Sequence, residues 1–314
     1  MPLHAALVRI LSELPQALNE PFARHPLASF IRNEAASELT GALGGEGSAL
    51  RVAGSPGAGN WAEVPWLAVF DPLVTETATR GYYVVYLFHT SEPAVYLSLN
   101  QGTTIVRQEF GSAARQVLAD RADFIRKRLT DLTSLLPITS IELGSTARLP
   151  GDYAAGHALG LRYELASLPS DNQLERDLSN AIQAYRALTF RGGLDADLDK
   201  AAEHGTGLET LLEIRRYRMH ARIERNSRAV RLAKKHHGTR CQVCEMSFSD
   251  MYGTLGEGFI EAHHLRPIAS LEEGIPVNFN ISSDFAVLCS NCHRMIHKTD
   301  DPSDIGALRQ LLRR

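Results

Sequence analysis

The four cysteines of this 314-residue chain form two Cys-x-x-Cys pairs in its last quarter. The first pair is Cys241 and Cys244, and the second is Cys289 and Cys292. Each spacing makes a tight turn whose two sulfurs can converge on one ion, and two such turns can close a tetrahedral site for structural Zn²⁺. Residues 1–18 are apolar but are interrupted by charged side chains and proline, which favours a packed helix over a secretory signal. Without an export signal, the cysteine pairs indicate a metal site and not disulfides.

Four histidines lie between these cysteines or directly after them: His263, His264, His293 and His297. His293 and His297 are four residues apart, so on a helix they point the same way. His263 and His264 are adjacent in a run expected to be extended, where successive side chains point to opposite faces. That divergence suits two tasks, one imidazole on a metal ion and one on a water molecule. A lone histidine is usually structural, but four in this register beside two cysteine pairs indicate a catalytic centre.

The segment Arg215–Arg309 resembles the HNH (ββα-metal) endonucleases, especially the zinc-stapled kind found in McrA-like restriction enzymes. The resemblance implies that His264 is the general base. It implies that His263 and His293 bind the catalytic ion, which would be Mg²⁺ or another divalent ion such as Mn²⁺ or Ni²⁺. His297 would be a further ligand or a phosphate contact.

Two acidic residues complete the set that this resemblance implies. Glu261 occupies a position that commonly supports the site, and Asp284 aligns with the asparagine in the middle of the family motif. An aspartate can brace the loop through hydrogen bonds, but its charge departs from the pattern. The implied reaction is phosphodiester hydrolysis, in which neutral His264 takes a proton from the attacking water and the ion stabilises the negative charge. Because one site cuts one strand, a double-strand break needs two protomers or two binding events, which makes a homodimer attractive.

A basic segment precedes the first cysteine pair. Residues 207–240 contain ten arginines and lysines and three acidic residues, although the formal net charge of the whole chain is −3. The cations recur every three or four positions of a helix predicted over 207–235, so they form a stripe along it. This local footprint indicates nucleic-acid binding, and a solvated helix face is the alternative. The residues predicted to contact DNA are Arg215, Arg218, Arg222 and Arg225.

The length and composition of the chain fit two globular domains. Its 44% hydrophobic and 22% charged residues are typical of an ordinary globular protein. No run of eighteen apolar residues occurs, so we expect no membrane span and a cytoplasmic location. We predict an α+β fold with a mixed α/β DNA-reading domain over 1–190. A helical linker with the basic helix follows over 191–235, and a small zinc-stapled ββα-metal domain occupies 236–314.

Hydrophobic periodicity predicts the elements of the first domain. Helices are expected over 3–18, 22–43, 113–135 and 171–188. Strands are expected over 66–70, 82–89, 94–99, 138–143 and 157–165. The glycine-rich stretch 54–60 is expected to be a loop.

The sequences over 57–66, 81–88 and 96–102 resemble the N-terminal DNA-binding domain of the methylcytosine-dependent McrB family, and the likeness spans about residues 1–190. It implies that the domain flips a modified cytosine out of the duplex into an aromatic and apolar pocket. Flipping costs a few kcal/mol of stacking and pairing, and stacking on an aromatic ring returns roughly 1–3 kcal/mol per base.

The resemblance also implies where the base is bound. An aromatic residue on the glycine loop of this family aligns here with Ala58, so either Trp61 provides the wedge or the domain accepts a different modification. Trp61 and Trp66 could instead be core residues beside a sheet. The candidate base- or DNA-contacting residues are Trp66, Leu87, Tyr153, Trp61 and Asn60.

The leading hypothesis is a type IV-like, modification-dependent restriction endonuclease acting on double-stranded DNA with modified cytosine. The chain has no Gly-x-x-x-x-Gly-Lys-Ser/Thr motif, so we expect no nucleotide requirement. One alternative is a sequence-specific HNH nickase or homing-type endonuclease, against which the N-terminal resemblance argues. Another alternative is a non-catalytic zinc module that binds DNA. Such a module would be expected to have lost the paired histidines, and all of them are present.

Overall fold

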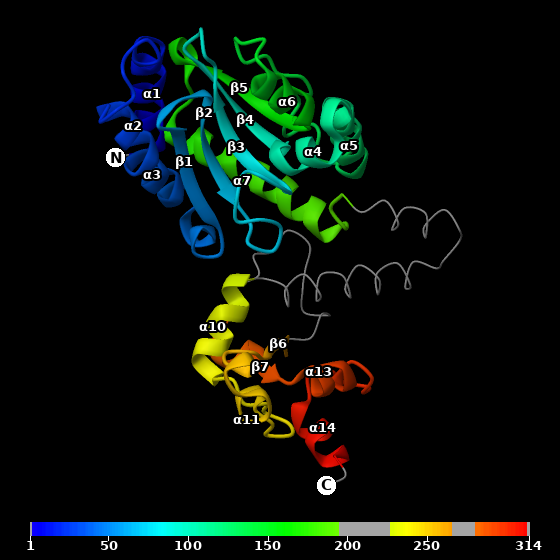
Figure 1. The fold of residues 1–314 in the computed structure, drawn as a ribbon. Helices are drawn as coiled ribbons and strands as arrows, with labels where there is room; N and C mark the ends of the chain where they lie inside the picture. Colours follow the sequence, from blue (N-terminus) through cyan, green and yellow to red (C-terminus); the bar gives the residue numbers. More distant parts are fainter. Residues whose placement is uncertain (1, 195–226, 266–279, 313–314) are drawn as a thin grey trace. The chain divides into compact units, whose positions relative to one another are not determined.

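The computed structural model describes residues 2–194, 227–265 and 280–312. The chain divides into two compact units, Met1–Asp195 and Ala196–Arg314, each with its own sheet and its own hydrophobic core (Figure 1). None of the helices in the described ranges is both long enough and apolar enough to cross a membrane.

The first unit is built on a five-stranded antiparallel sheet whose strands are neighbours in chain order. The central strands are buried along their whole length because helices cover both faces, which explains the continuous apolar sequence of β3. The strands are β1 (Arg51–Ala58), β2 (Asn60–Phe70), β3 (Tyr82–Phe88), β4 (Ala94–Gln101) and β5 (Leu159–Glu164).

One face of this sheet packs on α7 (Asp171–Phe190), which also contacts α1 (Leu3–Ala17). The rings of Tyr82 and Tyr185 meet edge to face at 5.6 Å, and the Tyr163 hydroxyl donates to Asp177 at 2.9 Å. The opposite face is covered from α6 (Arg148–Gly156), which packs on α4 (Thr103–Phe110) and α5 (Ala114–Arg128). Short 3₁₀ turns lie at Gly44–Ser48, Gly111–Ala113 and Leu165–Ser167.

Two further helices, α2 (Pro26–Arg32) and α3 (Glu34–Ala42), lie against β1. The approach is close enough to require a glycine, since a Cβ at Gly54 would lie 2.0 Å from the carbonyl oxygen of Ile31. A single helix was expected over 22–43, but Asn33 interrupts it with φ −113° and ψ −70°.

Several other elements of the first unit differ from those expected from the sequence. The glycine-rich stretch 54–60 is no open loop but belongs to the β1–β2 hairpin, in which Gly57 and Gly59 take the positive φ values that its turn requires. Segment 138–143 forms no strand, and only isolated bridges join Pro137 and Ile138 to Gly160. The helix expected over 113–135 ends at Arg128, and helices α4 and α6 were not expected.

The second unit contains a two-stranded antiparallel sheet followed by a helix (Figure 1). The strands are β6 (Glu261–His264) and β7 (Phe285–Leu288), and α13 (Ser290–Ile296) follows β7. Helix α10 (Ser227–His237) packs on both strands and on α12 (Ile281–Asp284). The other elements are α11 (Phe248–Tyr252), a 3₁₀ turn (Gly253–Gly256) and α14 (Ile305–Leu311).

Candidate metal centres and base-recognition surface

The four cysteine sulfurs of the second unit lie within 4.8 Å of one another and could hold a structural zinc ion. The first pair sits on a turn in which the Cys241 N–H donates to the Met246 carbonyl, and the Glu245 N–H donates to the Cys241 carbonyl, both at 2.9 Å. In the second pair, Cys289 precedes α13, and its Sγ accepts the N–H of Cys292 at 3.4 Å. We call these four residues the thiol cluster.

The chemistry of the thiol cluster fits a cation. All four cysteines are free thiols, and the sulfurs of Cys244 and Cys289 are 3.6 Å apart. Burial raises the pKa of Cys292, and its sulfur neighbours raise it further. The packed sulfurs disfavour a thiolate at Cys292, whereas a Zn²⁺ ion would deprotonate and bind such a set.

A second cluster, here called the histidine cluster, consists of His263, His293 and His297, whose ligand nitrogens also lie within 4.8 Å of one another. The ring centroids are 4.9 to 5.2 Å apart. His263 comes from β6, His293 from α13, and His297 directly follows that helix. Three imidazole nitrogens in one place form a donor set for a divalent transition metal.

Two hydrogen bonds fix which nitrogen each ring turns outward. His293 Nδ1 lies 2.5 Å from Glu261 Oε2, and His263 Nε2 donates to the carbonyl oxygen of Pro302 at 2.8 Å. A metal ion would therefore be bound by the other nitrogen of each ring, Nε2 of His293 and Nδ1 of His263. A carboxylate or carbonyl behind a histidine is the usual way in which a metal ligand is oriented. The histidine cluster thus fits a divalent ion.

Glu261 is held in its ionised form. Burial alone would raise its pKa, but hydrogen bonds from Ser290 and His293 and the electrostatic effect of the nearby His293 and Arg294 lower it below the ordinary value. The Ser290 hydroxyl donates to Glu261 Oε1 at 2.6 Å. Neither Ser290 nor Pro302 was singled out from the sequence, because serine and a backbone carbonyl carry no metal-site signature.

The two remaining residues of the predicted nuclease set lie apart from this cluster. His264 follows His263 on β6 and points to the opposite face, where its buried ring meets the edge of Phe285 at 5.3 Å. Asp284 ends α12 and accepts the N–H of Asn280 at 2.9 Å, while its carbonyl accepts the N–H of Leu265 at 2.8 Å. Asp284 therefore braces the turn that leads into β7.

The four arginines predicted to contact DNA, Arg215, Arg218, Arg222 and Arg225, lie outside the described residues, as does most of the helix expected over 207–235. The described continuation of that segment is helical as α10. Arg231 and Lys235 are exposed on it, so part of the basic footprint faces solvent.

In the first unit, the three predicted pocket residues lie together on the face of the sheet that α6 covers. Trp66 and Leu87 are cross-strand partners on β2 and β3, so their side chains are neighbours. Tyr153 comes from α6, and burial raises its pKa to about 12 against the opposing effect of a hydrogen bond from Trp66. Leu87 and Tyr153 are buried and Trp66 is partly exposed, so of the three only Trp66 reaches solvent to a larger extent.

Buried polar side chains hold α6 in place above this surface. The Asn100 amide donates to the Tyr153 carbonyl at 3.0 Å, and the Gln101 amide donates to the carbonyls of Leu118 and Gly156. The carboxylate of Asp152, which is also buried, binds the guanidinium groups of two arginines, Arg107 and Arg115. The sequence predicted neither α6 nor the anchoring of its carbonyl groups by Asn100 and Gln101.

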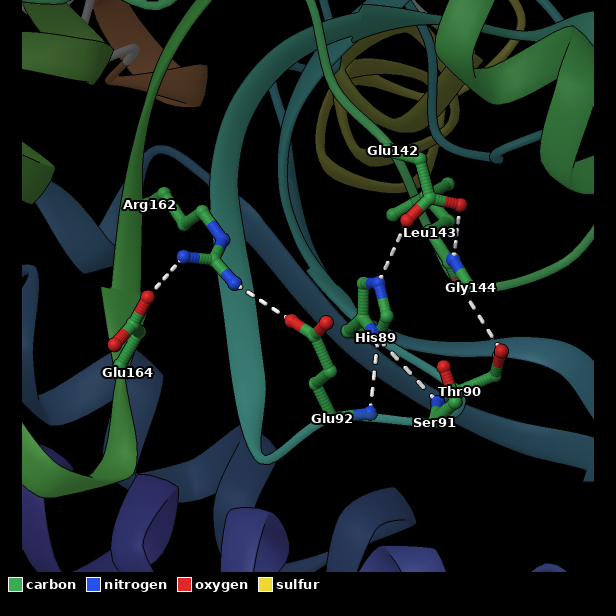
Figure 2. A network of polar contacts seen from close by, with 9 residues as sticks. All are labelled: His89, Thr90, Ser91, Glu92, Glu142, Leu143, Gly144, Arg162 and Glu164. Carbon is green, nitrogen blue, oxygen red and sulfur yellow. Dashed lines mark hydrogen bonds and ion pairs between the residues drawn. The ribbon is translucent and has the colours of Figure 1, made fainter.

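The segment leading into α6 is tied to the β3–β4 turn (Figure 2). His89 Nε2 lies 3.0 Å from Glu142 Oε2, and its Nδ1 accepts the N–H groups of Ser91 and Glu92 at 3.3 and 3.0 Å. Arg162 on β5 joins the network through Glu92 at 2.7 Å and through Glu164. Because Nδ1 accepts hydrogen bonds, the proton lies on Nε2 and is donated to Glu142.

The remaining candidates lie near the tip of the β1–β2 hairpin. Asn60 and Ala58 are exposed at the tip. Trp61 is turned inward: its indole N–H donates to the Glu20 carbonyl at 3.0 Å, and its ring packs edge-on against Phe22 at 5.2 Å. In this structure Trp61 therefore serves packing, whereas Asn60 is open to a partner.

Comparison with known families identifies the first unit. The model of the family described as the MrcB-like, N-terminal domain matches residues 9–190, which is more than half of the chain. No curated protein matches the chain.

Proposed function

The chain belongs to the family of the MrcB-like N-terminal domain, and on this premise we propose that it is a restriction endonuclease that recognises double-stranded DNA containing modified cytosine. The family supports the DNA-reading half of the proposal. The nuclease half rests on one observation: His263 on β6 meets His293 on α13 and His297 directly after it, and the same helix contains Cys292 and is preceded by Cys289. That arrangement is what the resemblance to HNH nucleases requires.

The residues of the second unit would have separate roles in the reaction. A divalent ion at the histidine cluster supplies stabilisation of the negative charge that develops on the phosphate. His264, on the opposite face from His263, accepts the proton of the attacking water. Glu261 holds His293 in the orientation that ligation needs.

The first unit would supply selectivity by binding the flipped base. Removing a base from the duplex costs a few kcal/mol, least where pairing is already weakened. The partly exposed Trp66 offers a ring on which the base can stack, and Leu87 and Tyr153 supply the apolar wall beside it. The exposed Asn60 at the hairpin tip would contact the DNA from which the base has left.

A cleavage panel on matched duplexes tests the function. The duplexes differ at one cytosine, which is unmodified, 5-methyl, 5-hydroxymethyl or N4-methyl, and each is incubated with Mg²⁺, Mn²⁺ or Ni²⁺ and no nucleotide. We expect cleavage of at least one modified duplex and little cleavage of the unmodified one. A plasmid substrate then distinguishes nicking from double-strand breaks. The dependence of the rate of double-strand breakage on protein concentration tests the proposed homodimer.

The alternatives give different outcomes in the same panel. Equal cleavage of modified and unmodified duplexes indicates a nuclease without modification dependence and refutes the role of the first unit. Binding of all duplexes without cleavage under any ion indicates a non-catalytic zinc module and refutes the nuclease.

Replacing Trp66 with alanine is expected to reduce the preference for modified DNA roughly tenfold, because about 1–3 kcal/mol of stacking is lost. Basal cleavage of unmodified DNA should not change. The measurement is the ratio of cleavage rates on modified and unmodified duplexes, and Trp66→Phe should keep most of the preference. Trp61→Ala is the matched control, since Trp61 packs against the segment between α1 and α2. A Trp66→Ala effect confined to salt sensitivity would point to backbone contacts and contradict base stacking.

A further inference from the structure

We propose that Ser290 is a positioning residue through which the thiol cluster sets the affinity of the histidine cluster for its divalent ion. The inference rests on the ion site of the proposed function and adds to it a link between two separate metal centres. Ser290 lies between Cys289 and Cys292, yet its hydroxyl group points to Glu261 on β6.

The link runs through both oxygens of one carboxylate. Ser290 Oγ donates to Glu261 Oε1 at 2.6 Å, and Glu261 Oε2 lies 2.5 Å from His293 Nδ1. A carboxylate is planar, so fixing Oε1 also fixes the direction in which Oε2 faces. Ser290 therefore determines how Glu261 meets His293, and hence the direction of His293 Nε2 toward the histidine cluster.

The position of Ser290 depends in turn on the thiol cluster. It is the first residue of α13, and the turn before it is held by Cys289, whose Sγ accepts the Cys292 N–H and whose carbonyl accepts the His293 N–H at 2.9 Å. An ion bound by both cysteines fixes this first turn of the helix. His293 directly follows Cys292, so the same short helix carries ligands of both centres.

The consequence is a coupling between the two ions. Binding at the thiol cluster orders the turn that carries Ser290, which orients Glu261 and then His293 before the second ion arrives. Such pre-organisation raises affinity without any new contact to the second ion. Partners behind a metal ligand typically change metal affinity by roughly 10- to 100-fold.

The experiment titrates Co²⁺ into the full-length protein with zinc retained at the thiol cluster. Visible absorption bands of Co²⁺ on nitrogen ligands report on the histidine cluster, and His297→Ala should remove them. Absorption from thiolate bound to Co²⁺ would reveal any exchange at the thiol cluster. We expect Ser290→Ala to keep one equivalent of zinc but to bind Co²⁺ roughly tenfold more weakly.

Two further variants separate positioning from folding. Ser290→Thr keeps the hydroxyl group and should restore the wild-type Co²⁺ affinity, while Asn291→Ala, at the exposed neighbouring position, should not change it. In a Glu261→Ala background, Ser290→Ala should have no additional effect, because its acceptor is gone.

Three other outcomes would contradict the proposal. Unchanged Co²⁺ affinity in Ser290→Ala would show that Glu261 orients His293 without the serine. Loss of zinc from Ser290→Ala would assign the serine to the thiol cluster and refute the link. Failure of the zinc-loaded wild type to bind Co²⁺ with histidine-type bands would instead remove the nuclease proposal itself.

Discussion

Replacing Cys289 with serine is expected to unfold the second unit and to leave the first unit folded. Among the described residues, the apolar cluster around the cysteines is small, and its buried aliphatic members are Val243, Ile260, Val287, Leu288, Ile296 and Leu308. A structural zinc ion contributes apparent binding free energy of about 10–16 kcal/mol, which becomes folding free energy in a unit this small. Cys289 has a second role as the cap of α13, so serine removes a metal ligand at the point where the helix begins.

The measurement is chemical unfolding of the full chain, with zinc content determined in parallel. The wild type should show transitions of both units, and the variant should lose zinc and retain only the transition of the first unit, whose large core is independent. Asn291→Ala alters the same turn without removing a ligand and should keep both. A Cys289→Ser protein with full zinc content and wild-type cleavage would contradict the thiol cluster as a structural centre.

The convergence of the cysteines and histidines follows from local geometry, which is why their spacing was informative. A Cys-x-x-Cys turn brings its sulfurs together by itself, and His293 and His297 share a side because they are four residues apart. The antiparallel pairing of β6 and β7 over four residues then brings His263 to the helix that follows β7.

The partners behind the ligands depend on contacts that no local pattern encodes. His263 is oriented by a backbone carbonyl, that of Pro302, 39 positions further along the chain. Any residue offers such a carbonyl, so its identity predicts nothing. The proposed role of Ser290 could not be predicted from the sequence either, because it depends on where Glu261 lies in space and not on the sequence neighbours of Ser290.

The first unit shows the same limit for secondary structure. Helix α6 contains a proline and two glycines in nine residues, so intrinsic propensity disfavours it. Buried side-chain amides on β4 stabilise it by donating hydrogen bonds to its carbonyl groups. Strands β3 and β4 were predictable because they are buried and their sequences contain runs of apolar residues. The proximity of Trp66 and Leu87 depends on strand pairing alone, so it follows once these strands are predicted.

Replacing His264 with alanine is expected to reduce cleavage of modified DNA by roughly 100- to 10,000-fold, the usual contribution of a general base. DNA binding should be retained, and so should Co²⁺ binding, because His264 does not belong to the histidine cluster. The measurement is single-turnover cleavage at saturating protein, with binding followed separately by gel mobility. Loss of rate with both binding properties intact would place His264 in the chemical step.

The buried ring of His264 makes a second variant necessary. Alanine leaves a space beside Phe285, and the resulting shift of β6 could move His263 as well. His264→Phe fills that space with another ring and cannot accept a proton, so it should lose cleavage as fully as His264→Ala while keeping stability close to wild type. If His264→Phe cleaves at the wild-type rate, the imidazole is a packing residue, and the base must be sought elsewhere in the second unit.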